Sequence, residues 1–158
     1  AELKFMSNND LMLALLKGNF PQFQNLLNEL IRNLMNFHDA AHYPEAAYHC
    51  FILGLLANLR NVYHIQSNPE TGYGRADILM RPKTERYKLA YVIEFKTIND
   101  DEDVDDAIAK AVRQIQDKAY DSALLEAGVP QEDIHYLAVV VQGPRATVKP
   151  ITKDELNS

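Results

Sequence analysis

Several features that define common protein classes are missing from this 158-residue sequence. It has a single cysteine, Cys50, so no disulfide can form within the chain. It has no apolar run near the roughly 20 residues that a membrane-spanning helix requires. Residues 1–5 lack the basic start and apolar centre of a signal peptide. We therefore expect a cytoplasmic protein in which Cys50 is a buried, reduced thiol.

The sequence also lacks internal repeats, low-complexity tracts and Gly/Ser-rich linkers. Its length and its apolar content of 47% are sufficient for one domain with its own core. We expect a single domain over residues 1–158, with residues 1–43 as an N-terminal helical extension packed on it. Because residue 1 is alanine and not methionine, we expect the chain to be a fragment of a longer protein.

Positive charge is scarce, and the formal net charge of −6 argues against a general nucleic-acid coat protein. The charge is unevenly distributed, however. Residues 100–106 contain six carboxylates, whereas residues 75–96 contain six basic and three acidic side chains. The basic segment can still attract a polyanion, and a bound metal ion would bring positive charge of its own.

The spacing of apolar residues predicts an ordered series of helices and strands. Helical spacing predicts helices over residues 9–16, 20–35, 44–59 and 102–127. Short apolar runs predict strands over residues 62–66, 75–81, 88–96, 134–141 and 146–149. A turn is predicted over residues 68–72. The predicted fold class is α/β, with a central mixed sheet flanked by helices.

Acidic and basic side chains lie together on two neighbouring predicted strands. Glu94 and Lys96 end the apolar run 89–93 and, two residues apart on a strand, point to the same face. Burying such groups is costly unless something binds them. A hairpin would bring Asp77 beside Glu94, and such carboxylates can hold Mg²⁺ or Mn²⁺. Lys96 would orient or deprotonate an attacking water, and Glu45 would reach in from the preceding helix.

Each of these residues also has a simpler interpretation. A Glu-x-Lys pair on a strand, as at Glu94 and Lys96, is usually a solvated cross-strand pair. Asp77 can be a strand-end turn residue, and Glu45 can be a favourable charge in the first turn of a helix. Their occurrence together, in this order and on these elements, favours a metal-dependent site.

The order Glu45, Asp77 and Glu94-x-Lys96 resembles the PD-(D/E)xK nuclease superfamily. The surrounding residues resemble the bacterial family usually found behind an AAA-type ATPase domain: Tyr48-His49, Leu53-Gly54-Leu55-Leu56, Gly72-Tyr73-Gly74-Arg75-x-Asp77, Ile93-Glu94-Phe95-Lys96, Gln114-Ile115 and Tyr120. The resemblance covers residues 11–149. It implies a restriction-endonuclease-like core of α-β-β-β-α-β order with extra N-terminal helices. It also implies a nucleic-acid substrate, DNA before RNA, and an N-terminal ATPase domain in the full-length protein.

The resemblance assigns a role to each residue of the signature. Asp77 and Glu94 would bind the Mg²⁺ or Mn²⁺, Glu45 would contribute to the same centre, and Lys96 would assist the nucleophile. The proline that usually leads the signature is Ala76 here, a tolerable change because proline bears no chemistry. The implied reaction is attack of a metal-activated water on a phosphodiester.

Two further positions are less firmly assigned. The resemblance selects Gln114 on the long predicted helix, but Gln116 and Tyr120 are also four residues apart, like the Gln-x3-Tyr element of related nucleases. The glutamines flank opposite sides of the apolar stripe, so we expect one to face the metal and prefer Gln114; each can also be a solvated helix flank. We assign Tyr120 and Arg75 to substrate binding, although Arg75 can instead pack on Tyr73.

A second hypothesis belongs to a different functional class. The same fold can serve as a catalytically silent module that binds protein or nucleic acid beside an ATPase domain, and the acidic net charge favours this interpretation. Uptake of Mn²⁺ separates the two hypotheses, because a pure interaction surface does not require a metal. A toxin or effector fragment with a nuclease fold is a third interpretation.

Overall fold

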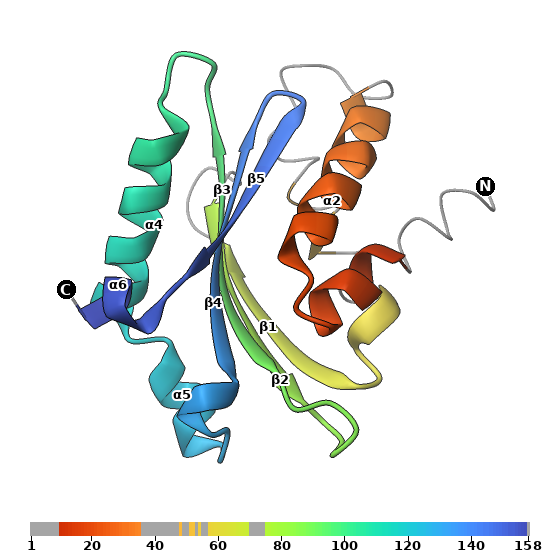
Figure 1. Cartoon of the computed structure of the whole chain (residues 1–158), viewed down its shortest axis with the longest axis vertical. Coiled ribbons are helices and arrows are strands. Elements are labelled where there is room, and N and C mark those ends of the chain that lie inside the picture. The colour runs from red at the N-terminus through yellow and green to blue at the C-terminus, as the bar shows by residue number, and fades with distance from the viewer. Residues whose placement is uncertain are drawn as a thin grey trace.

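A computed structural model describes residues 10–35, 48, 51–52, 54, 57–69 and 75–157. Its centre is a five-stranded sheet in the order β1-β2-β3-β4-β5 (Figure 1). The strands are β1 (Tyr63–Pro69), β2 (Arg75–Pro82), β3 (Ala90–Ile98), β4 (Ile134–Gln142) and β5 (Arg145–Ile151). All neighbours pair antiparallel except β3 and β4, which are parallel. The predicted α/β class with a mixed sheet is confirmed.

Helices cover both faces of the sheet (Figure 1). One face packs on residues 10–16, on α2 (Phe20–Met35) and on helical residues between positions 48 and 59. The other packs on α4 (Val104–Lys118), α5 (Asp121–Glu126) and α6 (Lys153–Asn157). A short 3₁₀ helix, η2 (Gln131–Asp133), precedes β4. The result is a three-layered α/β/α arrangement with a separate apolar cluster on each side of the sheet.

Phe95 fixes the direction of its neighbours on β3. Its ring stacks on Phe51 at a centroid distance of 5.3 Å and contacts Tyr48 at 6.0 Å, on the α2 side of the sheet. Because successive side chains on a strand alternate between faces, Glu94 and Lys96 must point to the opposite side, toward α4.

The edge strand β5 is covered by amide side chains of α2. Asn28 donates from Nδ2 to the Ala146 carbonyl at 3.0 Å and accepts from the Ala146 N–H at 2.7 Å. Gln24 Oε1 accepts from the Val148 N–H at 2.8 Å. These bonds satisfy backbone groups that an edge strand would otherwise leave open. They also hold α2 against the sheet.

The predicted helix over residues 102–127 is wrong in one respect, since it consists of two helices. Asp103 caps α4 by accepting a hydrogen bond from the Asp105 N–H at 3.1 Å. The helix ends at Ala119, whose φ of 47° is the one positive value at a described residue other than glycine. The left-handed conformation is unfavourable for alanine. It redirects the chain at Tyr120 before α5 begins.

Other differences lie at the ends of elements. The predicted first strand ends at residue 66, whereas β1 continues to Pro69, so Asn68 lies in a strand and not in the predicted turn. The final helix α6 was not predicted. Within the described ranges, none of the helices has the length and apolar character needed to cross a bilayer.

Candidate active site

Three buried charged side chains meet on neighbouring strands. Asp77, Glu94 and Lys96 are 5%, 0% and 3% exposed, and they are the buried polar residues of the described part of the chain. The register of β2 and β3 places Asp77 opposite Glu94 and Arg75 opposite Lys96. Directly paired residues share a face of the sheet, so both carboxylates and the ammonium lie on the side of α4. Burying these groups carries a large desolvation cost, which marks the place as a candidate site.

The position of β3 in the sheet explains why these groups are buried. β3 lies between β2 and β4, and α4 packs on its polar face. Every residue from Ala90 to Lys96 is buried as a result. The apolar residues of this run hold the strand in the core, and Glu94 and Lys96 are buried with them.

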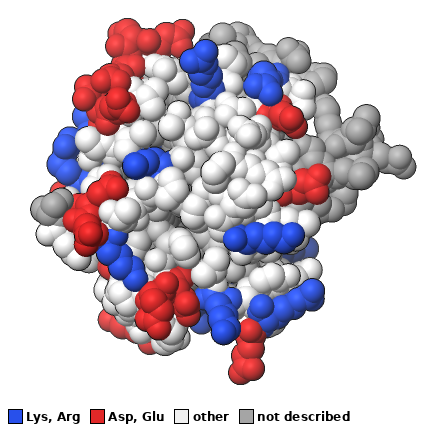
Figure 2. Space-filling view, viewed as in Figure 1, with Lys and Arg blue, Asp and Glu red and all other residues white. Residues whose placement is uncertain are grey.

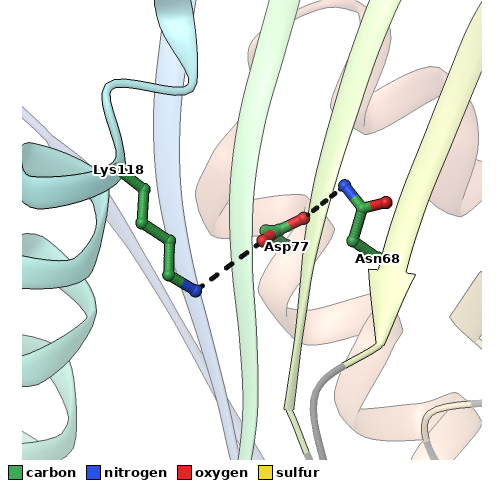
Figure 3. A network of polar contacts seen from close by, with 3 residues as sticks. All are labelled: Asn68, Asp77 and Lys118. Atoms are coloured by element: carbon green, nitrogen blue, oxygen red, sulfur yellow. Dashed lines mark hydrogen bonds and ion pairs between the residues drawn. The ribbon is translucent and has the colours of Figure 1, made fainter.

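Two side chains from different elements, Asn68 and Lys118, contact the Asp77 carboxylate in Figure 3. Asn68, opposite Asp77 on β1, donates from Nδ2 to Asp77 Oδ1 at 2.8 Å. Lys118, the last residue of α4, places Nζ 3.9 Å from Asp77 Oδ2, with 41% of its side chain exposed. The amide orients the carboxylate, and the ammonium offsets its charge. Neither Asn68 nor Lys118 was predicted for the site.

Tyr120 faces the same carboxylates from the turn after α4. Its hydroxyl is buried and makes no hydrogen bond of good geometry with a described residue. Burial, followed by the nearby Asp77 and Glu94 carboxylates, raises the pKa of Tyr120, while Lys118 opposes this shift. Lys118 Nζ also lies 5.5 Å from the centroid of the Tyr120 ring. A protonated hydroxyl is therefore available beside the acidic pair.

The two glutamines of α4 have different surroundings. Gln116 donates from Nε2 to the carbonyls of Glu155 and Leu156 at 3.1 and 2.9 Å, and so holds α6 against α4. Gln114 lies four residues before Lys118, on the same side of the helix. Its Oε1 is buried and has no hydrogen-bond partner within the described ranges. Its catalytic role stays a prediction.

Arg75 and Lys96 line one cleft, of about 350 Å³, at the end of the sheet where β3 leads into α4. Asp101, Asp106 and Lys110 line it as well. Acidic side chains gather at this end of the molecule (Figure 2). The predicted alternative contact of Arg75 with Tyr73 lies outside the described residues. Arg75 thus lies beside Lys96 in a cleft whose lining contains both basic and acidic side chains.

Glu45, the predicted third carboxylate, also lies outside the described residues. Among the residues that the structure does describe, no group of three His, Cys, Asp or Glu side chains is arranged to hold a metal ion. The paired Asp77 and Glu94 nevertheless fit Mg²⁺ or Mn²⁺, because such ions often take one or two carboxylates and complete their shell with water and substrate oxygens.

Comparison with known proteins adds one match. A family model described as the PD-(D/E)XK nuclease superfamily matches residues 43–150. This range includes β1 to β4, α4, and all of the residues that we predicted for the site. No curated protein and no solved structure matches the chain.

Proposed function

This chain belongs to the PD-(D/E)XK nuclease superfamily, and on that premise we propose that it is a Mg²⁺- or Mn²⁺-dependent nuclease that hydrolyses phosphodiester bonds, preferring DNA to RNA. The observation that carries the proposal is the shared burial of Asp77, Glu94 and Lys96 on one face of the β2–β3 pair. Nucleases of this superfamily typically use divalent metals and act on nucleic acid.

Asp77 and Glu94 would hold the metal, and Glu45 is proposed as a third ligand. When bound, the ion would polarise the phosphate and lower the pKa of a bound water. Asn68 supports this arrangement by fixing Asp77 through Oδ1, which leaves Oδ2 directed toward the α4 side (Figure 3).

The position of Lys96 supports a catalytic role. It shares a face with Glu94 and reaches the cleft that Arg75 also lines. Its ammonium can orient the attacking water and stabilise the charge that develops on the phosphate. Burial strengthens such interactions, because water screens them less in the interior. Arg75 would bind a neighbouring phosphate through its guanidinium.

Tyr120 and Gln114 are proposed as groups that position water or substrate. The Tyr120 hydroxyl can donate a hydrogen bond, and Gln114 Oε1 can accept one. Both atoms are buried, and neither makes a hydrogen bond of good geometry with a described residue. A substrate phosphate could accept from the Tyr120 hydroxyl, and a bound water could donate to Gln114 Oε1; either bond would offset the cost of burying these atoms.

Lys118 competes with a metal ion for Asp77. We expect Lys118→Met to tighten Mn²⁺ binding by up to about fivefold, because a partly exposed ion pair contributes roughly 1 kcal/mol at most. Calorimetric titration of both proteins with Mn²⁺ measures this difference. Arg113→Met, in an exposed residue of the same helix, is the control and should leave the affinity unchanged. Weaker Mn²⁺ binding by Lys118→Met would show that Lys118 supports the metal site.

Cleavage assays test the proposed function directly. The purified chain is incubated with end-labelled single- and double-stranded DNA and RNA, with Mn²⁺ or with EDTA. We expect Mn²⁺-dependent cleavage, stronger on DNA than on RNA. Cleavage that persists in EDTA would contradict the metal-dependent mechanism. Binding of Mn²⁺ without cleavage of any substrate would favour the catalytically silent module, for which the acidic residues beside the cleft also argue.

A further inference from the structure

Part of the sheet face that carries the site is exposed to solvent at the edge strand β1. Among the described strands, α4 packs mainly on β3 and β4, and the edge strand β1 is not one of its main contacts. On β1, His64, Gln66 and Asn68 are all exposed, whereas Tyr63 is buried. Alternate exposure of this kind is typical of a strand with one solvated face. The exposed residues lie on the same face as Asp77, since Asn68 pairs with it directly.

The register defines a path of residue pairs on this face, exposed on β1 and mostly buried on β2, that leads from Asp77 to Arg81. Successive pairs on this face are Asn68 with Asp77, Gln66 with Leu79, and His64 with Arg81. Arg81 lies four residues from Asp77, a distance of about 13 Å along the strand at roughly 3.3 Å per residue. At a rise of 3.4 Å per nucleotide, this distance corresponds to about four nucleotides of a B-form strand.

A basic groove lies at the far end of this path. It has a volume of about 440 Å³ and lies between the two strands and α5. Its described titratable lining residues are Tyr63 and four potential cations, Arg60, His64, Arg81 and Lys83, and none of the described lining residues is acidic. Leu79 and Leu124 contribute apolar surface. In a chain with a net charge of −6, such a local excess of positive charge is unexpected for a surface without an anionic ligand.

Positive charges in the groove affect His64, and one basic side chain of the groove, that of Lys83, is held by the backbone. Desolvation and the positive charges of Arg81 and Lys83 lower the pKa of His64. Lys83 donates from Nζ to the Arg60 carbonyl at 2.6 Å, and its N–H donates to the Val62 carbonyl at 2.8 Å. His64 and Arg81 therefore lie on the paired strands β1 and β2, and hydrogen bonds tie Lys83 to the turn that carries Arg60. This placement reduces the entropy lost when an anion binds.

We propose that the groove formed by Arg60, His64, Arg81 and Lys83 binds the phosphodiester backbone of a nucleic-acid strand whose scissile phosphate lies at Asp77. The inference rests on the proposed function, because it takes the carboxylate pair as the end of the path. Phosphate contacts position a substrate without reading its sequence, so the groove sets the direction and the minimum length of the strand.

Binding without cleavage tests this proposal. The affinity for a labelled single-stranded oligonucleotide is measured by fluorescence anisotropy in EDTA over a range of salt concentrations. For Arg60→Gln/Arg81→Gln we expect weaker binding. The slope of log affinity against log salt should fall in magnitude by about 1.4, since each phosphate contact to a single strand contributes roughly 0.7. A dinucleotide, too short to reach the groove from Asp77, should bind both proteins equally.

The matched control carries two neutral substitutions at the opposite edge of the sheet. Arg145→Gln/Lys149→Gln removes two exposed charges from β5 and should leave the slope unchanged. If the groove variant is less stable, Arg60→Lys/Arg81→Lys keeps the charge and should restore binding. An unchanged slope in Arg60→Gln/Arg81→Gln overturns the groove and leaves the proposed function standing. A smaller slope for Arg60→Gln/Arg81→Gln, together with no Mn²⁺-dependent cleavage by the wild type, supports the groove as a phosphate-binding site but overturns both the proposed function and the placement of a scissile phosphate at Asp77.

Discussion

Replacing Lys96 with methionine should lower the single-turnover cleavage rate by at least about 100-fold, the smallest contribution usual for a positioned acid–base group. Methionine has a similar length and suits a position that is 3% exposed. The substitution removes the ammonium that would orient water and stabilise the phosphate. Because Asp77 and Glu94 are unchanged, Mn²⁺ should still bind. The rate is measured at saturating Mn²⁺, and metal binding is measured separately.

Lys17→Met is the matched control for this experiment. Lys17 is exposed, follows the helix of residues 10–16 and lies away from the site. Its removal should leave the cleavage rate within experimental error. If Lys96→Met cleaves as fast as the wild type, Lys96 is not catalytic. If it loses Mn²⁺ binding instead, the lysine acts by holding the metal site together.

The second large effect is expected from the carboxylates. Asp77→Asn and Glu94→Gln keep the shape of each side chain but weaken its binding of a hard cation. We expect each to abolish cleavage at Mn²⁺ concentrations that saturate the wild type, and to raise the concentration needed for half-maximal activity at least about 100-fold. About a 100-fold loss of metal affinity is the upper end of the range for removing a group that only hydrogen-bonds to a metal ligand. Removing a direct ligand should therefore weaken metal binding further. Titration of the cleavage rate with Mn²⁺ provides the measurement.

Glu126→Gln is the control for the loss of one negative charge. Glu126 is exposed at the end of α5 and should be dispensable. Far-UV circular dichroism checks that the variants keep their secondary structure. We expect the fold to survive Glu94→Gln, because an amide is cheaper to bury than a carboxylate. Normal Mn²⁺ dependence in either carboxylate variant would exclude that residue as a ligand.

The centre of the fold was predictable because its signals are local and strong. The apolar run before Glu94 marked β3, and the alternation of side chains placed Glu94 and Lys96 on one face. A hairpin between β2 and β3 was enough to bring Asp77 opposite Glu94. The ligand and catalytic roles of these residues stay predictions. Glu45 lies outside the described residues, so its place in the site is equally a prediction.

The missed parts of the site depend on tertiary structure. Asn68 precedes a proline, a pair typical of turns, but pairing with β2 keeps it in a strand and brings its amide to Asp77. Lys118 reaches Asp77 because α4 ends at Ala119, and an alanine in the left-handed conformation carries no sequence signal. Gln116 is engaged by α6, a helix that was not predicted. Propensity and periodicity describe none of these contacts.

Calorimetric titration with Mn²⁺ tests the central claim that Asp77 and Glu94 form a metal site. The wild type should take up Mn²⁺, and the double variant Asp77→Asn/Glu94→Gln should show no saturable heat over the same range. Glu126→Gln should bind like the wild type. Equal binding by the wild type and the double variant, or no binding by the wild type, would contradict the account.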